Sequence, residues 1–416
     1  MRGWTASTRR PIGSSWWQGV IFDRTSSTSA HTTTATTSHF HLKTLCGGRW
    51  GERYGVPPER LYTDYKAMLA AEQPDIVSVV TQPEHRAEIL IYAAAQPCVR
   101  ALFPEKAFAS SLAEAQAVVE ACKEHGVIVI MGTLRRYDSG YDAAQRLVHS
   151  GELGQLKTII AHSTSSLFNG SSHTFDAVNW LNKDAKPVSI MGELTADPTV
   201  EMADGTTKPL LDQDEAGNNV LRADPLGHGI VEYDNGVTAY MLNSGRGTEF
   251  EAICERGVVS AWNDGETWHL REPRGIHMLP QQEREKWTGS QLDASPNLEL
   301  DDDAPSPTLN AVNDLVNALD HNLLPRGGEH GSVPLGNSEL IFGLIESHTK
   351  GGAKVALPMV EHGNWRLARE DIWGRQPVFQ RAEGHIGGKN SPMTRAEDFD
   401  ELVEKTKAEA TADARL

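Results

Sequence analysis

The fold is decided by residues 75–131, DIVSVVTQPEHRAEILIYAAAQPCVRALFPEKAFASSLAEAQAVVEACKEHGVIVIM. Three short apolar runs in this stretch are typical of buried parallel strands. They cover 75–81, 98–103 and 127–131. Two segments with apolar residues at helical spacing separate them, and a capping-box sequence, Ser111-Leu-Ala-Glu114, opens the second. Strand, helix, strand, helix and strand in this order predict an open, parallel α/β sheet.

A ligand site is expected where the predicted strands end, because open parallel sheets bind ligands at the carboxyl ends of their strands. In this chain those ends read Thr81-Gln-Pro, Pro104-Glu-Lys and Gly132-Thr-Leu-Arg. The sequence therefore places a threonine, a glutamate and a lysine at one edge of the sheet.

A different pattern begins at about residue 150. Seven strand-like runs follow, and the turn Asp234-Asn-Gly236 between two of them is a strong hairpin signal. The runs cover 157–165, 188–194, 229–233, 237–242, 250–254, 258–262 and 267–270. Helices are predicted at 173–181, 309–319 and 338–349, and a polar insertion at 280–308. We expect a second, α+β domain with a mostly antiparallel open sheet.

Charge is distributed unevenly along the 416 residues. The whole chain holds 39 Lys and Arg against 56 Asp and Glu, a formal net charge of −17. The first 50 residues hold six basic residues, one acid and 17 Ser or Thr, so residues 51–416 carry a net charge of −22. An acidic body repels phosphate backbones, which argues against nucleic acid as the main partner.

The first 50 residues show no sustained helical or strand periodicity, and we expect an atypical, disordered head there. Their Arg-rich, Ser/Thr-rich and acid-poor composition is also that of an organellar transit peptide, although the amphipathic helix of such a signal is missing. A wrongly assigned gene start or reading frame is a third interpretation.

The sequence lacks the features of several other classes of protein. No apolar run reaches the length of about 18 residues that a membrane-spanning helix needs. The four cysteines form no CxxC pair, and the sixteen histidines have no metal-ligand spacing. Nucleophile elbows, P-loops and HExxH are absent as well. We therefore expect a cytoplasmic protein with no membrane partner and no metal centre.

Seven phrases of the sequence recur in the order of a known family. They are YGVPPERLYTDYKAML, PDIVSVVTQPEHRAEI, FPEKAFASSLAEA, GTLRRYDSGYDAAQRLVHSGELGQLKTI, HTFDAVNWL, GIVEYDNGVTAYML and ESHTKGGAKVALP. Over roughly residues 50–360 the chain thus resembles the Gfo/Idh/MocA oxidoreductases, typified by glucose-fructose oxidoreductase and inositol dehydrogenase. The resemblance implies oxidation of a secondary hydroxyl of a sugar, polyol or related small molecule, with NAD or NADP as cofactor.

The resemblance also implies how the chain is divided. Residues 51–150 match a Rossmann-type dinucleotide-binding domain, and residues 151–360 match the family's α+β domain, whose open sheet often forms a homo-oligomer interface. Residues 1–50 are then an atypical head, and residues 361–416 a charged C-terminal extension.

Lys106, in Pro104-Glu-Lys-Ala107, matches the catalytic lysine of the family. Alkoxide character develops on the substrate oxygen as hydride leaves the carbon, and an ammonium group within hydrogen-bond reach stabilises it. The family usually has proline after this lysine, whereas Ala107 follows it here. A cis peptide bond is costly before a residue other than proline.

His173 is the second catalytic residue that the resemblance implies. It would accept the proton of the same hydroxyl, because imidazole titrates near neutral pH. Asp176 lies on the same helical face and is expected either to contact substrate or to stabilise the helix N-terminus. The family has an aspartate four residues before this histidine, where this chain has Asn169. Asn169 is expected to hold a sugar hydroxyl without taking its proton.

Five further residues match family positions around the dinucleotide. Thr81, Pro83 and His85 lie in the loop that passes beside the cofactor. Glu105 is the acidic residue of the Glu-Lys signature, and Arg136 matches a position near cofactor and substrate. For each of them a role in a turn or a helix cap is the alternative.

The glycine-rich half of a dinucleotide site is missing from its expected place. Such a fold needs a first strand, a G-x-G-x-x-G turn, a helix, a second strand and an acid about twenty residues later. The nearest match, Cys46-Gly-Gly48-Arg-Trp-Gly51, has cysteine in place of the first glycine and leaves no room for the helix. We therefore expect cofactor binding to be weakened or lost if these residues are the native ones.

Three functional interpretations stay open. The first is a sugar or polyol dehydrogenase whose amino-terminal strand and glycine turn were lost to a wrong gene model. The second is an enzyme of the same fold that retains NAD and cleaves glycosides or eliminates groups through a transient ketone. The third is a degenerate member without catalysis, which keeps the second domain for assembly or ligand sensing.

Overall fold

The computed structural model describes about two thirds of the chain. The described residues are 20–21, 56–62, 64–163, 165–202, 205–244, 247–265, 267–271, 306–369, 381–382 and 385–386. The predicted disordered head, the polar insertion and the C-terminal extension therefore lie almost entirely outside the described residues.

Four parallel strands form the first sheet, in the order β1, β2, β3, β4. Their bounds are β1 Val20–Ile21, β2 Ile76–Val79, β3 Ala101–Pro104 and β4 Ile128–Val129. In the register, Val20 lies opposite Ser78 and Ile76 opposite Ala101. The parallel sheet predicted from residues 75–131 is confirmed, with one more strand supplied by the head.

Strand β1 occupies the position of the first strand in a doubly wound sheet. In the order 3-2-1-4-5-6, strand 1 pairs with strand 4, which is followed by strands 5 and 6. The observed order β1-β2-β3-β4 has the same arrangement as the 1-4-5-6 part of that sheet. This corrects the expectation that the head supplies no first strand, at Val20 and Ile21.

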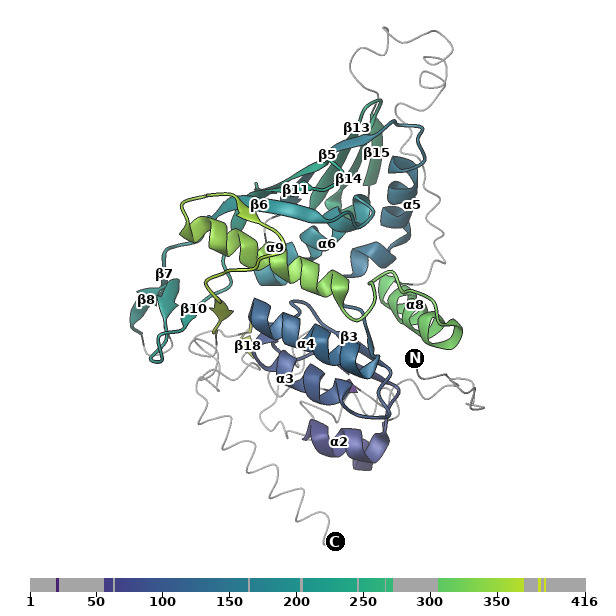
Figure 1. Cartoon of the computed structure of the whole chain (residues 1–416), viewed down its shortest axis with the longest axis vertical. Coiled ribbons are helices and arrows are strands. Elements are labelled where there is room, and N and C mark those ends of the chain that lie inside the picture. Colours follow the sequence, from purple (N-terminus) through teal and green to yellow (C-terminus); the bar gives the residue numbers. More distant parts are fainter. Residues whose placement is uncertain are drawn as a thin grey trace.

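Helices cover both faces of the first sheet (Figure 1). Helices α3 (Pro83–Ala94) and α4 (Leu112–His125) pack side by side on one face, and α8 (Pro307–His321) covers the other. Leu102 belongs to the core beneath α3 and α4, whereas its neighbour Ala101 belongs to the core beneath α8. Successive residues of a strand point to opposite faces, so a short apolar strand is buried on both sides.

Local sequence explains where these helices begin. The hydroxyl of Ser111 accepts the backbone N–H of Glu114 at 3.2 Å, as the capping-box sequence predicts. Asp64 caps α2 (Tyr65–Glu72) in the same way, by accepting the N–H of Lys66 at 2.9 Å.

Eight strands form the sheet of the second domain, in the order β15-β14-β13-β5-β12-β11-β6-β16. Their bounds are β5 Leu156–Ser163, β6 Pro187–Leu194, β11 Gly227–Tyr233, β12 Thr238–Asn243, β13 Glu249–Cys254, β14 Val258–Trp262, β15 Thr267–Arg271 and β16 Val355–Ala356. All neighbouring strands are antiparallel except β12 and β5. The predicted mostly antiparallel sheet is confirmed.

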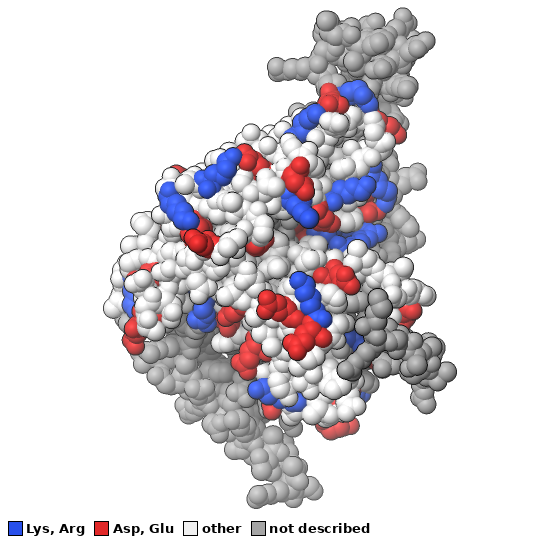
Figure 2. All heavy atoms as spheres, viewed as in Figure 1, with Lys and Arg blue, Asp and Glu red and all other residues white. Residues whose placement is uncertain are grey.

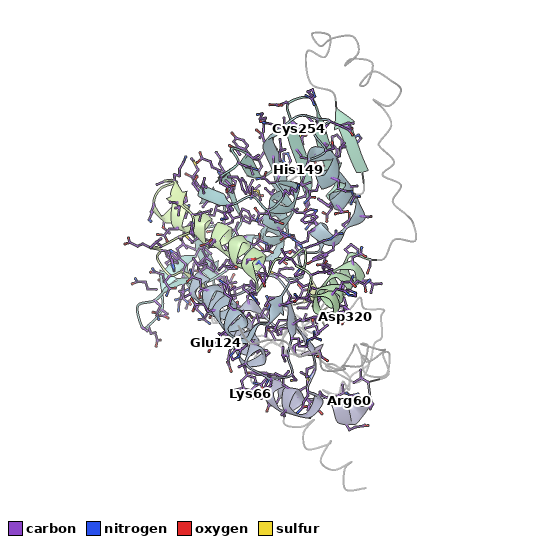
Figure 3. The ribbon with its side chains drawn as sticks, turned by 45° about the vertical axis from the view of Figure 1, so that its right-hand side comes forward. Arg60, Lys66, Glu124, His149, Cys254 and Asp320 are labelled. Atoms are coloured by element: carbon purple, nitrogen blue, oxygen red, sulfur yellow. The ribbon has the colours of Figure 1, made fainter. Side chains whose placement is uncertain are left out.

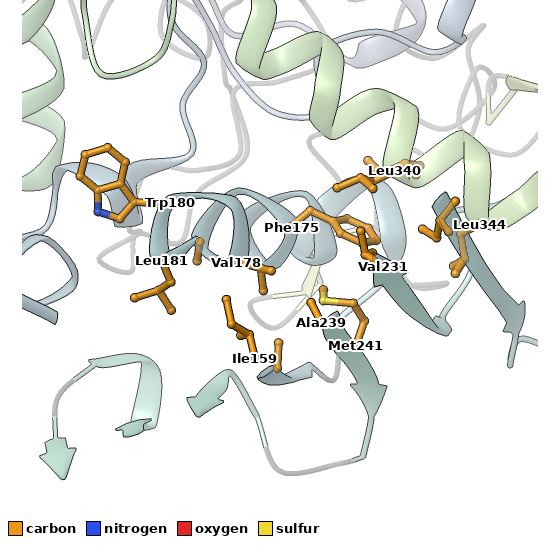
Figure 4. Close-up of a cluster of buried hydrophobic side chains, with 14 of the residues drawn as sticks. Ile159, Phe175, Val178, Trp180, Leu181, Val231, Ala239, Met241, Leu340 and Leu344 are labelled. Carbon is orange, nitrogen blue, oxygen red and sulfur yellow. The ribbon is translucent and has the colours of Figure 1, made fainter. Parts of the chain in front are cut away.

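One face of this sheet is covered by α5 (Ser139–Val148), α6 (Ser172–Leu181) and α9 (Ser332–Thr349). Figure 4 shows the core between α6, α9 and the strands, in which Phe175 and Leu340 face one another. Burial of such a side chain stabilises the fold by about 1.5–3 kcal/mol, so this core fixes α6 on the sheet.

Large apolar side chains are exposed on strands of the second sheet. Val188, Tyr240, Leu242 and Trp262 are each about two fifths exposed, on β6, β12 and β14. The homo-oligomer interface predicted for this sheet stays a prediction.

A small sheet connects the two domains. Its strands are β9 (Leu211–Gln213), β10 (Asn219–Leu221) and β17 (Arg366–Leu367), in the order β17-β10-β9. The N–H of Leu367 donates to the carbonyl of Ser110 in the first domain at 2.8 Å. Two hairpins complete the described strands; they are β7 (Thr199–Glu201) with β8 (Thr207–Pro209), and β18 (Arg381–Ala382) with β19 (His385–Ile386).

Charges of both signs are interspersed over the face shown in Figure 2. Cys98, Cys122 and Cys254 are free thiols, and Cys254 lies in the second domain, far from Lys66 in the first (Figure 3). Within the described residues, no group of three or more His, Cys, Asp or Glu could hold a metal ion. No helix in this part of the chain is long and apolar enough to cross a membrane.

Candidate active site

Lys106 lies in the loop after β3, at the carboxyl edge of the first sheet. The N–H of Glu105 donates to the carbonyl of Val79 at 2.9 Å, and the N–H of Gly132 donates to the carbonyl of Pro104 at 2.8 Å. The peptide bond between Lys106 and Ala107 is cis. Hydrogen bonds to the strands on either side therefore fix the backbone from which Lys106 projects.

Arg86 binds the backbone of this loop, a role that was not predicted from the sequence. It lies on α3, is only 2% exposed, and donates to the carbonyls of Thr81, Glu105 and Ala107, the second at 2.7 Å. One guanidinium thus binds the backbone on both sides of Lys106 and at the end of β2. Its helical spacing from the apolar face of α3 was a signal for this role, because an arginine on a buried face needs partners.

The second domain meets Lys106 at Asn169. The ammonium group of Lys106 donates to Oδ1 of Asn169, which lies in η4 (Leu167–Ser171), a π-helical turn directly before α6. Burial lowers the pKa of Lys106, opposed by the carboxylates of Glu105 and Asp224 and reinforced by the charge of Arg86. The lysine and asparagine singled out from the sequence are therefore in contact, across the boundary between the domains.

His173 is the second residue of α6. Its Nδ1 atom is buried and has no hydrogen-bond partner among the described residues. Burial, reinforced by the charges of Arg135 and Lys106, lowers the pKa of His173 to about 3. The imidazole is therefore neutral at neutral pH and has a lone pair on one ring nitrogen, but it is a weaker base than the imidazole titrating near neutral pH that was expected from the sequence.

Arg135 is a second charged residue that the sequence analysis missed. Its guanidinium donates to both carboxylate oxygens of Asp264, at 2.5 and 2.7 Å, and Asp264 lies in the turn after β14. The hydroxyl of Tyr141 donates to the same carboxylate at 3.2 Å. The ion pair with Asp264 fixes the guanidinium of Arg135, whose positive charge lowers the pKa of His173.

Asp224 lies behind Asn169, in the link between β10 and β11. Its carboxylate accepts the backbone N–H groups of Phe168 and Asn169 at 2.8 and 3.0 Å, and the hydroxyl of Ser166 at 2.7 Å. We call Lys106, Asn169, His173 and Asp224 the open cluster, because these polar groups converge without saturating one another.

Arg136 and Asp176 form a closed cluster with Asp184. Arg136 is 1% exposed and Asp176 fully buried, and their shortest contact is 2.7 Å. Burial alone would lower the pKa of Arg136, but the carboxylates of Asp176 and Asp184 outweigh this effect and raise it. The two side chains are buried against each other and join η3 (Leu134–Tyr137) to α6, while substrate contact by Arg136 and Asp176 stays a prediction.

Four residues were predicted to bind the cofactor. The structure places two of them just after strands and the other two on α3. Thr81 is 3% exposed, and its buried Oγ1 has no hydrogen-bond partner within the described part of the chain. Glu105 lies beside Gly132, where a Cβ atom would come within 3.3 Å of the Glu105 carboxyl carbon. Pro83 is buried at the first turn of α3, and His85 is exposed on that helix. Thr81 and Glu105 are therefore the two at the strand ends.

The strand ends fit the reactive end of a dinucleotide better than its phosphates. The orphaned hydroxyl of Thr81 and the carboxylate of Glu105 offer hydrogen bonds to an amide and a ribose beside Lys106. In the sequence, however, no glycine follows β1 until Gly47, so the glycine turn of a pyrophosphate cradle is missing.

Residues 27–133 match the model of a family described as "oxidoreductase family, NAD-binding Rossmann fold". D-apiose dehydrogenase of Paraburkholderia graminis is 40% identical over 105 residues, which are 25% of this chain and 27% of that protein. The scyllo-inositol 2-dehydrogenase (NAD(+)) of Bacillus subtilis is 29% identical over 38% of this chain and 51% of its own length. The chain thus spans about a quarter to a half of the length of these two relatives.

Solved structures share the fold over more of the chain. An inositol dehydrogenase homolog from Azotobacter vinelandii, complexed with NADH and myo-inositol, matches 74% of this chain and 86% of its own, with a TM-score of 0.55 and 15% identity. An aldose-aldose oxidoreductase from Caulobacter crescentus matches 74% of this chain and 88% of its own, with a TM-score of 0.53 and 17% identity. The two-domain arrangement is therefore that of known oxidoreductases.

Proposed function

We propose that this chain, which belongs to the Gfo/Idh/MocA family of oxidoreductases, oxidises a secondary hydroxyl of a sugar or polyol by hydride transfer to a nicotinamide dinucleotide. The observation that carries the proposal is the contact of Lys106 with Asn169 at the carboxyl edge of the parallel sheet, beside the neutral His173. The names of the matched relatives, an apiose and an inositol dehydrogenase, support this substrate class.

The oxidation removes a hydride from the carbon and a proton from the oxygen of the substrate. A nicotinamide ring, when bound, supplies the hydride acceptor, and Thr81 and Glu105 would hold that end of the cofactor. The remaining task of the protein is to stabilise charge on the oxygen and to take its proton.

Lys106 stabilises the developing alkoxide. An ammonium group has three N–H donors, of which one binds Asn169, so within the described part of the chain two are left for the substrate oxygen. The contact with Asn169 also fixes the direction in which these donors point. Because the group is half-buried, its interaction with an alkoxide is less screened than on the surface.

His173 takes the proton of the hydroxyl. The ring is neutral, and its Nδ1 is not consumed by a hydrogen bond to any described residue. The cations of Lys106 and Arg135 disfavour a lasting imidazolium, which favours passing the proton on to solvent. Asn169 keeps its amide group for orienting a neighbouring hydroxyl of the substrate, without accepting a proton.

The test is to substitute Lys106 by alanine and to measure turnover. Purified protein is incubated with NAD or NADP and with inositols and aldoses, and reduced cofactor is followed by its absorbance. We expect Lys106→Ala to lower kcat by about 100- to 1,000-fold, as for loss of one preorganised donor. The matched control is Lys66→Ala on the exposed side of α2, which should leave kcat unchanged.

Other outcomes would overturn the proposal. Retained turnover in Lys106→Ala would remove the lysine from the mechanism. Release of product from an aryl glycoside without net cofactor reduction would instead indicate the glycoside-cleaving class. Failure of the full chain to bind either cofactor in calorimetry would indicate a member without catalysis.

A further inference from the structure

We infer that Asp224 is a positioning residue of this site, whose carboxylate holds Asn169 in place for the ammonium group of Lys106. The inference rests on the proposed function of Lys106 and Asn169. Asp224 lies about 55 residues after Asn169 in the sequence, and none of the strand-end motifs includes it. Only the folded chain brings it against Asn169.

The segment Asp224-Pro225 binds the start of the η4 turn at four points. The carboxylate accepts the N–H groups of Phe168 and Asn169 and the hydroxyl of Ser166, all between 2.7 and 3.0 Å. The carbonyl of Pro225 accepts the N–H of Leu167 at 2.8 Å. The first N–H groups of a helical turn have no partner within the turn, so they depend on acceptors of this kind.

A carboxylate suits this place better than an amide does. Ionised Asp224 can only accept hydrogen bonds, and all three side-chain contacts come from donors. Burial raises the pKa of Asp224, opposed by these hydrogen bonds and by the charge of Arg369. An asparagine of the same shape would turn its NH2 group toward at least one of these donors and would lose that bond.

Asn169 connects this carboxylate to the reactive lysine. Its backbone N–H donates to Asp224, and its side-chain Oδ1 accepts from Lys106. The two contacts lie on one residue, so a shift of the turn moves the amide oxygen away from the ammonium group. Asp224 therefore acts on Lys106 through Asn169, in addition to its charge.

The charges that face Lys106 determine the direction of the expected change. The carboxylates of Glu105 and Asp224 favour the protonated lysine, whereas burial and the cations of Arg86 and Arg369 disfavour it. His173, on α6, is neutral and adds no charge. Removal of the Asp224 charge, or of the amide oxygen that it positions, should therefore lower the pKa of Lys106.

The experiment measures Lys106 directly and needs no substrate. The full chain is treated with acetic anhydride between pH 6 and 11, and acetylation of Lys106 is quantified by peptide mass spectrometry. We expect Asp224→Asn to move the midpoint down by about 0.5–1 pH unit relative to the native chain. The matched control is Asp214→Asn, which also removes a carboxylate that accepts two backbone N–H groups, in the turn between β9 and β10. Its midpoint should not move.

Kinetics separate positioning from a merely structural role. With an active substrate, Asp224→Asn should lower kcat by about 10- to 100-fold and change KM by less than about threefold, as for loss of a residue that orients a reacting group. In the Asn169→Ala background the same substitution should have little further effect on kcat, because the residue through which it acts is gone.

Asn169→Ala keeps the inference testable if Asp224→Asn does not fold. That variant leaves the carboxylate contacts to the backbone intact and should lower the Lys106 midpoint in the same direction. An unchanged midpoint in both variants, or an equal change in Asp214→Asn, would overturn the inference. A native chain without dehydrogenase activity would refute the proposed function only, because the acetylation measurement does not depend on turnover.

Discussion

The open and closed clusters use adjacent residues of the same elements for opposite purposes. His173 and Asp176 lie one turn apart on α6, and Arg135 and Arg136 are neighbours in the chain. Asp176 and Arg136 are buried and bound to each other, whereas His173 keeps a buried nitrogen without a partner among the described residues. In the closed cluster the charged groups satisfy one another, whereas His173 keeps a ring nitrogen for the reaction proposed above.

The closed cluster is saturated in every direction that the structure describes. Arg136 donates to Asp176, to Asp184 and to the carbonyl of Arg326 at 2.8 Å, and stacks on Trp180 at 5.3 Å. Asp176 also accepts the side-chain N–H of Asn337 at 2.9 Å. These partners come from η3 (Leu134–Tyr137), α6, α9 and the segment after α8, so the cluster joins four parts of the chain.

The largest expected effect is the loss of stability on breaking the closed cluster. Asp176→Asn keeps the shape of the side chain but leaves the buried guanidinium of Arg136 short of a negative charge. Removal of one partner of a buried pair costs about 3–5 kcal/mol of the free energy of unfolding. Urea unfolding at pH 7 measures this loss, and cofactor binding by the folded fraction should be unchanged.

The control for this prediction is an exposed ion pair. Glu232→Gln breaks the ion pair with Lys354, whose side chain is about half exposed, and should cost far less stability, because water screens an exposed pair. Equal losses in the two variants would show that the burial of Arg136 and Asp176 adds nothing to stability.

A smaller effect, of about 2 kcal/mol, is expected from the open cluster when the pH falls from 7 to 5. Burial first, and then the charges of Arg135 and Lys106, hold the pKa of His173 at about 3, against about 6.5 in the unfolded chain. Above pH 6.5 the ring is neutral in both states. As the pH falls below 6.5, the unfolded chain binds a proton that the folded chain does not, so stability decreases by up to about 1.4 kcal/mol per pH unit until about pH 3.

His173→Gln removes the imidazole that binds this proton in the unfolded chain. The variant should lose less stability than the native chain between pH 7 and pH 5, as measured by urea unfolding at each pH. His85→Gln, at an exposed position of α3, should behave like the native chain. If the native chain and His173→Gln lose stability in parallel, the imidazole of His173 is not held neutral by its surroundings.

The sequence predicted the fold well where periodicity is strong. Apolar runs such as 75–81 and 127–131 carry the strand signal in their own residues, and the capping residue Ser111 carries the helix start. The two-residue strand Val20–Ile21 could not be predicted, because so short a run has no period. Its place in the sheet depends on pairing with β2, far along the chain.

The sequence pointed to motif residues of the candidate site and missed contacts between distant segments. The positions of Lys106 and Asn169 came from family phrases, and the structure shows that they meet. Arg86 and Asp224 act on backbone groups, which leave no pattern in side-chain spacing. The sequence singled out Arg136 and not its neighbour Arg135; in the structure Arg136 is buried against Asp176, and Arg135 pairs with Asp264.

The smallest expected effect comes from placing an ion pair in the open cluster, like the pair of Arg136 and Asp176 in the closed cluster. Asn169→Asp places a carboxylate where the amide oxygen accepts from Lys106, and an opposite charge at this distance raises the pKa of the lysine by about one unit. The change stays small because residue 169 is exposed and water screens the pair. The acetylation midpoint of Lys106 should rise by that unit, opposite to the shift in Asp224→Asn, with kcat within about tenfold of the native value.

Asn322→Asp adds the same charge at the exposed end of α8 and should leave the midpoint in place. A midpoint that does not rise in Asn169→Asp would mean that the side chain of residue 169 does not face Lys106 in solution, and the contrast between the two clusters would then rest on His173 alone.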